Sequence, residues 1–270
     1  QAHRENLERL VEERTAQFQA KLAEAQNDLN RAQDDAAKLP PGATAAEVIE
    51  HRAALQSLVQ TYRLHLNDLA ALEAIRQRTQ DLDRQIKNWT GFPEPPPYSV
   101  LFVDDLRTAV HALNLKIEAA ERERATLETF VAEGQAAMQA SDGKLRRISE
   151  ELETAGTQAA ATRLTWQRTL GQTRGRAVAA LTAYHEGRRQ TAAEELVELR
   201  RRLAFTQRQL APAAQYTSFP QADLDAVLER LARERTQIDG DIQAAETELQ
   251  IRQKALAAAR GRDALFGDWT

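Results

Sequence analysis

The chain has 270 residues, with 36 Lys and Arg against 40 Asp and Glu, and its formal net charge of −4 favours neither nucleic acid nor an anionic membrane. The absence of cysteine excludes disulfides, zinc ribbons and thiol catalysis. Alanine (49), leucine (32), glutamate (25) and the basic residues make up more than half of the chain, a composition typical of long helices and coiled coils. Leu, Ile, Val and Phe together supply only 57 residues, so we expect thin helix-on-helix seams and no thick globular core.

The first two helices are predicted over residues 3–38 and 45–88, on either side of Pro40-Pro41-Gly42. In both segments apolar residues recur three and four positions apart, which predicts one buried stripe on each helix. Thr44 and Glu47 stand three residues apart at the start of the second helix. This spacing predicts a capping box, in which each side chain binds a free backbone amide of the other residue.

A third helix is predicted over 100–155. Its apolar stripe keeps its phase across Asp142-Gly143, although Asp-Gly is by itself a turn signal. Continuity of phase favours one helix of about 55 residues, roughly 80 Å long at 1.5 Å per residue. Gly134 and Gly143 are expected to be its soft points, each costing about 1 kcal/mol relative to alanine.

The last two helices are predicted over 157–211 and 221–261, after a turn at Gly156-Thr157 and a break from Pro212 to Pro220. Ser218 to Gln221 has the spacing of a second capping box. The apolar stripe of the fifth helix consists of Leu224, Leu228, Leu231, Ile238, Ile242, Leu249 and Leu256. We therefore expect an all-α fold, an elongated antiparallel bundle or coiled coil of about five long helices in one domain over 1–270.

Reversal of direction at each break would bring two aromatic loops to the same end of the bundle. One candidate site follows, with two readings. It is either a surface that docks a partner, since Pro93-x-x-Pro96 has the PxxP form, or a stiff connector that closes the bundle end. The residues of this site are Trp89, Phe92, Pro93, Pro95, Pro96, Pro97, Tyr98, Tyr216 and Phe219.

Other kinds of site find no support in the residue patterns. We expect no catalytic residues, no cofactor and no metal, because nucleophile motifs and phosphate loops do not occur and the histidines lack metal-ligand spacing. His51 and His65 share a helix face but stand about 21 Å apart along its axis. The arginine clusters at 146–147, 188–189 and 200–202 are expected to pair with acids nearby on the same helix. No apolar run approaches the 18 or so residues of a membrane span.

Two segments carry a family resemblance. The segment 89–101, WTGFPEPPPYSVL, runs on into Asp104-Asp105-Leu106-Arg107, and the segment 219–225, FPQADLD, is followed by Leu228-Glu229-Arg230-Leu231. Together they resemble the long helical region that precedes the membrane domain in large bacterial channels of the small-conductance mechanosensitive family. The surrounding helices, rich in alanine, arginine and glutamine, are similar in style.

The resemblance implies a part of a larger membrane protein, on the periplasmic side of the bacterial inner membrane. It implies a non-catalytic domain with a structural or regulatory role in gating or assembly. Its partners would be other subunits of a homo-oligomeric channel or cell-envelope proteins. The alternative is a soluble coiled-coil scaffold, cytoplasmic in location, that docks a partner through the aromatic, proline-rich loops.

Overall fold

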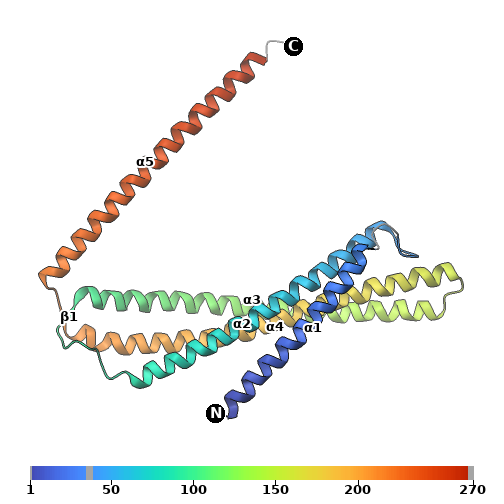
Figure 1. The fold of residues 1–270 in the computed structure, drawn as a ribbon, viewed down its shortest axis with the longest axis horizontal. Coiled ribbons are helices and arrows are strands. Elements are labelled where there is room, and N and C mark those ends of the chain that lie inside the picture. The colour runs from blue at the N-terminus through green and yellow to red at the C-terminus, as the bar shows by residue number, and fades with distance from the viewer. Residues whose placement is uncertain (1, 35–38, 267–270) are drawn as a thin grey trace. The chain divides into compact units, whose positions relative to one another are not determined.

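The computed structural model describes residues 2–34 and 39–266, and these residues form five long α-helices (Figure 1). The helices are α1 (Ala2–Asp34), α2 (Ala45–Asn88), α3 (Val100–Glu153), α4 (Gln158–Gln215) and α5 (Gln221–Phe266). Two strands of two residues each, β1 (Tyr98–Ser99) and β2 (Thr217–Ser218), lie in the loops before α3 and α5. The expected all-α fold of five long helices is confirmed.

The chain divides into two compact units, and of the three boundaries between them one falls in the loop after α2, one inside α3 and one inside α4. The first unit comprises residues 1–91 and 109–207, and the second comprises 92–108 and 208–270. The first unit therefore contains α1, α2 and most of α3 and α4. The second contains both strands, α5 and the ends of α3 and α4. The grouping of all five helices into a single domain stays a prediction.

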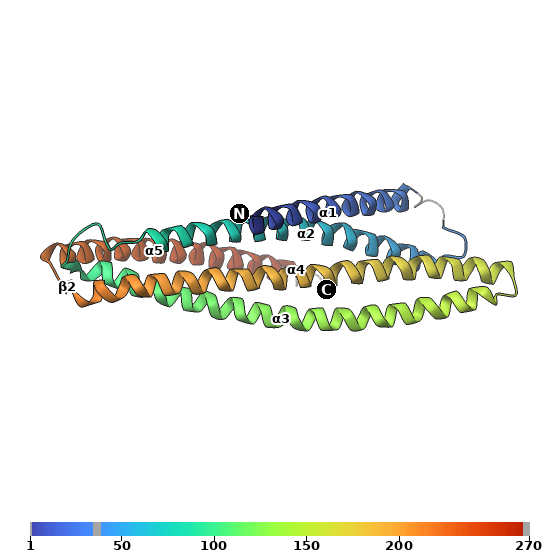
Figure 2. The same cartoon turned by 90° about the horizontal axis from the view of Figure 1, so that it is seen from below.

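In the first unit α1 and α2 lie side by side and run in opposite directions (Figures 1 and 2). α2 and α4 run in the same direction, because ion pairs between them keep a nearly constant sequence separation. This separation is 116 residues for Glu47–Arg163, 120 for Asp68–Arg188 and 118 for Asp83–Arg201. The 36 residues from Glu47 to Asp83 correspond to about 54 Å of helix, so α2 follows α4 over most of its own length.

Two small hydrophobic clusters form the core of the first unit, as expected for a chain with few large aliphatic residues. One joins α1, α2 and α4, and the other joins α3 and α4. The buried members of the first are Ala25, Leu29, Leu55, Leu58, Val59, Tyr62 and Ala180. Those of the second are Leu113, Ala120, Leu196 and Leu199. Alanine at the inward positions lets the helix backbones approach closely.

Glycines set the close approach of α3 to α4. A Cβ on Gly134 would lie 3.0 Å from both Cβ and Cγ2 of Thr182, and closer still to its Oγ1. A Cβ on Gly171 would lie 2.8 Å from Leu145. Nothing lies within 4 Å of the corresponding position on Gly143. The sequence predicted that glycine costs stability relative to alanine at both Gly134 and Gly143. For Gly134 this prediction is wrong, because Thr182 of the neighbouring helix leaves no room for a Cβ there.

The second unit is held together where its two loops meet. β1 and β2 pair in parallel, Tyr98 opposite Thr217 and Ser99 opposite Ser218. The Tyr98 amide also donates to the Tyr216 carbonyl at 2.8 Å. Ser99 Oγ donates to Asp223 Oδ2 at 2.6 Å and accepts from the Leu101 amide at 3.1 Å, so one hydroxyl joins the first turns of α3 and α5. The expected meeting of the two loops is confirmed.

Several local expectations can be compared with the helix ends. α3 runs unbroken through Asp142-Gly143 for 54 residues, as its phase predicted. Pro212 does not end α4, which continues to Gln215; a proline in the last turn removes only one helical hydrogen bond. Ser218 does not form the second capping box, because it belongs to β2 and donates to the Tyr98 carbonyl at 3.4 Å. Residues 35–38 of the first predicted helix lie outside the described residues.

Among residues 2–34 and 39–266, no helix is both long enough and apolar enough to cross a membrane.

Gly134→Ala is expected to lower the free energy of unfolding by about 1–3 kcal/mol, because the new methyl group would overlap Thr182. Gly143→Ala, on the same helix, is the matched control. It is expected to raise the free energy of unfolding by up to about 1 kcal/mol through helix propensity alone. Urea denaturation followed by circular dichroism measures both changes, and equal responses of the two variants would contradict this account of the α3–α4 contact.

Candidate functional site

The residues of the predicted loop site fall into separate environments. Trp89, at the end of α2, packs edge-on against Phe205 of α4 with ring centroids 5.9 Å apart. Phe92 contacts Tyr98 at 5.1 Å and Phe102 at 5.0 Å, which forms a small aromatic cluster in the second unit. Part of the predicted set is therefore engaged in packing within the chain.

The remaining members of that set are on the surface. Pro93, Pro95, Pro96 and Pro97 are exposed, and Pro96-Pro97 is a cis peptide. Tyr216 and Phe219 are 51% and 59% exposed. The structure thus brings the two loops together through β1 and β2 but leaves their prolines and two of their aromatic rings accessible.

Sequence reasoning missed a buried polar network in the first unit, where Asp68 of α2 faces α4. The side chain of Asp68 is 6% exposed. Its Oδ2 accepts from Thr191 Oγ1 at 3.1 Å, and its Oδ1 accepts from Arg188 Nη1 at 3.3 Å. Arg188 also pairs with Glu123 of α3 through Nη2. Two carboxylates and one guanidinium therefore tie α2, α3 and α4 to one another.

Burial and charge oppose each other in this network. Burial raises the pKa of Asp68, while the Thr191 hydroxyl and the Arg188 guanidinium act in the opposite direction. Burial lowers the pKa of Arg188, but hydrogen bonds and charge from Glu123 and Asp68 outweigh it and leave the pKa above its usual value. The arginine stays charged, so the Asp68 carboxylate has a permanent partner.

One helical turn away, His65 joins α1 to α4. Its ring stacks on Phe18 of α1 with centroids 4.1 Å apart and meets Tyr184 of α4 edge-on at 5.6 Å. His65 Nε2 lies 3.1 Å from the Ala180 carbonyl, which can only accept, so Nε2 donates. Burial lowers the pKa of His65, which keeps the ring neutral near pH 7 and suited to its apolar surroundings.

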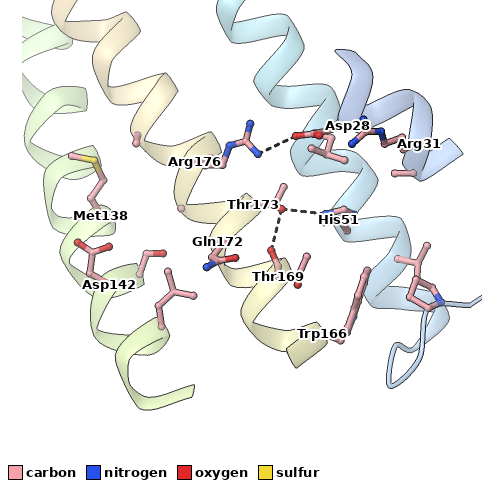
Figure 3. Close-up of a pocket in the computed structure, with 18 residues that line it drawn as sticks. Asp28, Arg31, His51, Met138, Asp142, Trp166, Thr169, Gln172, Thr173 and Arg176 are labelled. Atoms are coloured by element: carbon pink, nitrogen blue, oxygen red, sulfur yellow. Dashed lines mark hydrogen bonds and ion pairs between the residues drawn. The ribbon is translucent and has the colours of Figure 1, made fainter. Parts of the chain in front are cut away.

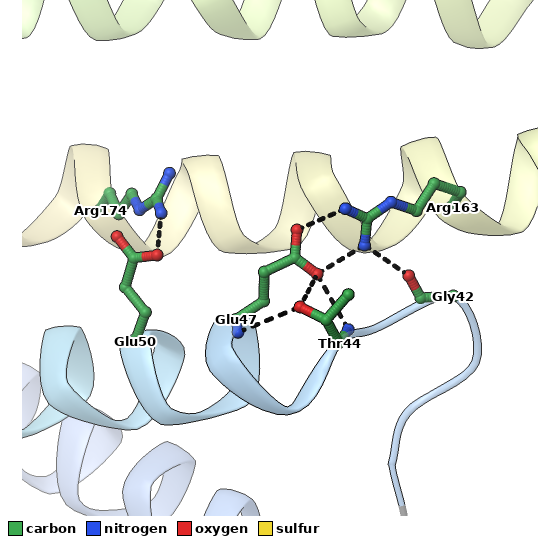
Figure 4. A network of polar contacts seen from close by, with 6 residues as sticks. All are labelled: Gly42, Thr44, Glu47, Glu50, Arg163 and Arg174. Carbon is green, nitrogen blue, oxygen red and sulfur yellow. Dashed lines mark hydrogen bonds and ion pairs between the residues drawn. The ribbon is translucent and has the colours of Figure 1, made fainter.

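Glu47 forms a second network at the start of α2 (Figure 4). The predicted capping box with Thr44 is present: the Glu47 amide donates to Thr44 Oγ1 at 3.4 Å, and the Thr44 amide donates to Glu47 Oε2 at 3.0 Å. The same carboxylate accepts two hydrogen bonds from Arg163 of α4, at 2.5 and 2.6 Å. These bonds lower the pKa of Glu47 to about 2.

Gly42 lets Arg163 reach this cap. Its carbonyl accepts from Arg163 Nη1 at 2.8 Å, and its backbone has a φ of +77°, which side chains other than glycine rarely adopt. A Cβ at Gly42 would also lie 2.9 Å from the Arg163 backbone. The turn after Pro40-Pro41 is therefore built against α4.

A cavity of about 840 Å³ lies beside this cap, lined by residues of all four helices of the first unit (Figure 3). Its lining mixes apolar side chains with charged ones; representatives are Asp28, His51, Met138, Asp142, Trp166 and Arg176. Arg176 is already paired with Asp28 at 3.0 Å and with Glu24 at 3.0 Å, so its charge is compensated.

Two polar groups in the cavity wall have a defined state. Thr173 donates its hydroxyl proton to the Thr169 carbonyl at 3.0 Å, so it accepts from His51 Nε2 at 3.1 Å and fixes the proton of that ring on Nε2. Burial lowers the pKa of His51. The buried Trp166 Nε1 has no hydrogen-bond acceptor. That nitrogen is itself buried, so it is not presented to a molecule in the cavity.

The arginine clusters pair differently from what was expected. Arg189 and Arg202 do bind acids on their own helix, Glu186 and Glu198. Arg188, Arg200 and Arg201 reach other helices instead, where the last two meet Glu121 and Asp83, each at 2.6 Å. The expectation of pairing along one helix is wrong for these three, because their acids lie on α2 and α3, which only the fold brings near.

No group of three or more His, Asp or Glu side chains in the described part of the chain lies close enough to hold a metal ion. A scan against protein-family models found no matching family, and searches of curated proteins and of solved structures found no match either.

Asp68→Ala is expected to lower the free energy of unfolding by about 1–3 kcal/mol, because Arg188 and Thr191 lose their partner in a buried setting. Asp83→Ala is the matched control, since it removes a carboxylate from the same seam where the Asp83 side chain is 51% exposed. That change is expected to cost about 0–1 kcal/mol. Thermal or urea unfolding measures both, and an Asp83 effect as large as that of Asp68 would contradict the central place of Asp68.

Glu47 is expected to make stability fall at acidic pH. Its pKa is about 2 in the folded state against 4.5 for the free side chain, so its contribution is fully present above pH 4.5. The contribution is lost as pH falls from 4.5 through about 2, because the unfolded chain takes up the proton first. The free energy of unfolding measured at pH 6 and pH 2.5 should therefore fall more for the native chain than for Glu47→Gln. Parallel losses in the two proteins would refute this role of Glu47.

Proposed function

We propose that this chain is a non-catalytic helical domain with a structural or regulatory role in the gating or assembly of a bacterial mechanosensitive channel. We place it on the periplasmic side of the inner membrane, where it contacts other subunits of the same channel or cell-envelope proteins. The context of a channel comes from the resemblance of segments 89–107 and 219–231. The mechanical part of the proposal comes from the α2–α4 seam.

The observation that carries the proposal is the fixed register of α2 on α4. Four ion pairs, Glu47–Arg163, Glu50–Arg174, Asp68–Arg188 and Asp83–Arg201, are spread along the seam. Sliding one helix past the other would break all four together and would leave the Asp68 carboxylate buried without a partner. A unit held in this way moves as a rigid body, which suits a domain that passes a displacement to its neighbours.

The location can be tested with a single introduced cysteine, because the chain has none. Glu128, whose side chain is 50% exposed on α3, is a suitable position. In the full-length protein, Glu128→Cys is expected to react with a membrane-impermeant maleimide in intact cells whose outer membrane has been made permeable. Labelling only after lysis would contradict the periplasmic location, and the full-length parent protein controls for cysteines elsewhere.

The reading frame beyond Thr270 provides an independent check. For a channel subunit it should encode several apolar stretches of about 20 residues. A frame that closes without any such stretch would exclude the channel context.

A second function has its own support in the structure. The exposed rings of Tyr216 and Phe219, beside the exposed prolines of the 93–97 loop, suit a soluble scaffold that docks a partner through this end. Tyr216 and Phe219 are better positions than Phe92 for probing this surface, because Phe92 packs against Tyr98 and Phe102. Cytoplasmic labelling and a frame without apolar stretches would favour this function.

A further inference from the structure

We propose that α5 is a docking helix for a helix of another polypeptide that has an apolar stripe flanked by basic residues. This inference goes beyond the proposed function, because it assigns a binding surface and the chemistry of its occupant. It is based on three features of α5: the spacing of its apolar residues, their exposure, and the charge beside them.

The spacing is that of a coiled-coil seam. From Leu224 to Leu256 the separations alternate strictly between four and three residues, which places these positions on one face of the helix. We call this set the α5 stripe. Its members are Leu224, Leu228, Leu231, Arg235, Ile238, Ile242, Ala245, Leu249, Arg252 and Leu256.

Within the described part of the second unit, no other element covers the stripe. Every residue from Leu228 to Leu256 is exposed, and the six leucines and isoleucines among them that belong to the stripe are each at least 50% exposed. α5 (Figure 1) is anchored at its start, where Asp223 accepts from Ser99 and where Leu224 and Val227 are partly buried. Long helices in proteins gain most of their stability from packing of an apolar face, so a stripe of this length calls for a partner.

The charges beside the stripe decide what kind of partner fits. In a coiled coil, the positions next to the seam face the corresponding positions of the partner helix. Between Leu224 and Leu256 there are ten such positions, of which six are acidic and none is basic; the acids are Asp225, Glu234, Asp239, Asp241, Glu246 and Glu248. Between Leu224 and Leu256 the basic residues outside the stripe are Arg230, Arg233 and Lys254, and all three lie on the outer face.

This pattern opposes pairing of α5 with a second α5. In a parallel pair Glu234 would face Asp239, and Asp241 would face Glu246 of the other copy. An antiparallel pair also sets acid against acid, because each flank then meets its own equivalent. Arg235 would in addition meet Arg235 in the seam of a parallel pair. A helix with lysine or arginine on its flanks removes these repulsions and replaces them with attraction.

Ion pairs within α5 do not remove its preference for a partner helix with basic flanking residues. Glu234 and Asp239 pair with Arg230 and Arg235 at 3.9 and 3.8 Å, and Glu248 pairs with Arg252. Each of these side chains is at least 58% exposed, so the pairs are weak and can exchange for partners on another helix.

Two synthetic 35-residue helical peptides test the proposal against the full chain. Both carry isoleucine and leucine in a coiled-coil seam; one has lysine at the flanking positions, and the matched control has glutamate there. Fluorescence anisotropy at 50 mM salt is expected to show at least tenfold tighter binding of the lysine peptide. The preference should shrink at 500 mM salt, where charges are screened.

Variants of the full chain locate the binding to the stripe. Ile238→Asp with Ile242→Asp is expected to weaken binding of the lysine peptide at least tenfold. Ile251→Asp is the matched control, since Ile251 is 62% exposed on the same helix but lies outside the stripe. It is expected to bind as the native chain does. Circular dichroism should show the same helicity in all three proteins.

Charge reversal provides the sharpest outcome. Combining Asp239→Lys, Asp241→Lys and Glu246→Lys is expected to transfer the preference to the glutamate peptide. Equal binding of the two peptides by the native chain, or binding of neither, would overturn the proposal. So would sedimentation of the native chain as a dimer that Ile238→Asp with Ile242→Asp dissociates, because a second copy would then be the occupant.

Discussion

Asp68 is a carboxylate that folding removes from water, and the first unit is arranged so that this charge is compensated. Arg188 and Thr191 of α4 supply the hydrogen bonds, and the guanidinium continues to Glu123 of α3. Gly187 leaves room for the carboxylate, since a Cβ there would lie 3.3 Å from Asp68 Oδ2. A displacement of either helix by one turn would separate the carboxylate from both donors. Because an unpaired buried charge is costly, this one contact excludes neighbouring registers of the seam.

The chain needs such a constraint because its apolar stripes specify register weakly. Alanine is the commonest residue, and successive alanines on a stripe offer nearly the same surface to a neighbouring helix at each turn. A seam of this kind could slide with little loss of buried area. Polar contacts that fit only one alignment supply the missing specificity, at His65 with Ala180 and at Glu47 with Arg163 as well as at Asp68. The charged residues set the alignment, while the small residues let the helices come close.

Local features of the fold could be predicted from the sequence, and contacts between helices could not. The phase of the third stripe predicted an unbroken α3, and the spacing of Thr44 and Glu47 predicted their capping box, because both depend on residues a few positions apart. Arg163 reaches that same cap from 116 residues away, and no pattern in the sequence pointed to it. The meeting of the two loops followed from counting helix reversals. Which aromatic rings it buries did not follow, since Phe92 packs inward while Phe219 remains exposed.

Acidic residues stand beside apolar stripes in both units, and in the first they are paired across helices. In the first unit, acids of α2 and α3 pair with arginines of α4. The acids would repel a second acidic helix, but here they hold α2 and α3 against a basic one. On α5 the acids again stand beside an apolar stripe, but between Leu224 and Leu256 no position next to that stripe carries arginine or lysine. The first unit thus shows what completes such a surface: a helix that brings guanidinium groups to the flanks of the seam. An α5 stripe covered by a neutral helix would leave the flanking acids uncompensated, and one covered by its own copy would add to their repulsion. The partner chemistry inferred for α5 is therefore the chemistry that the first unit already uses between its own helices.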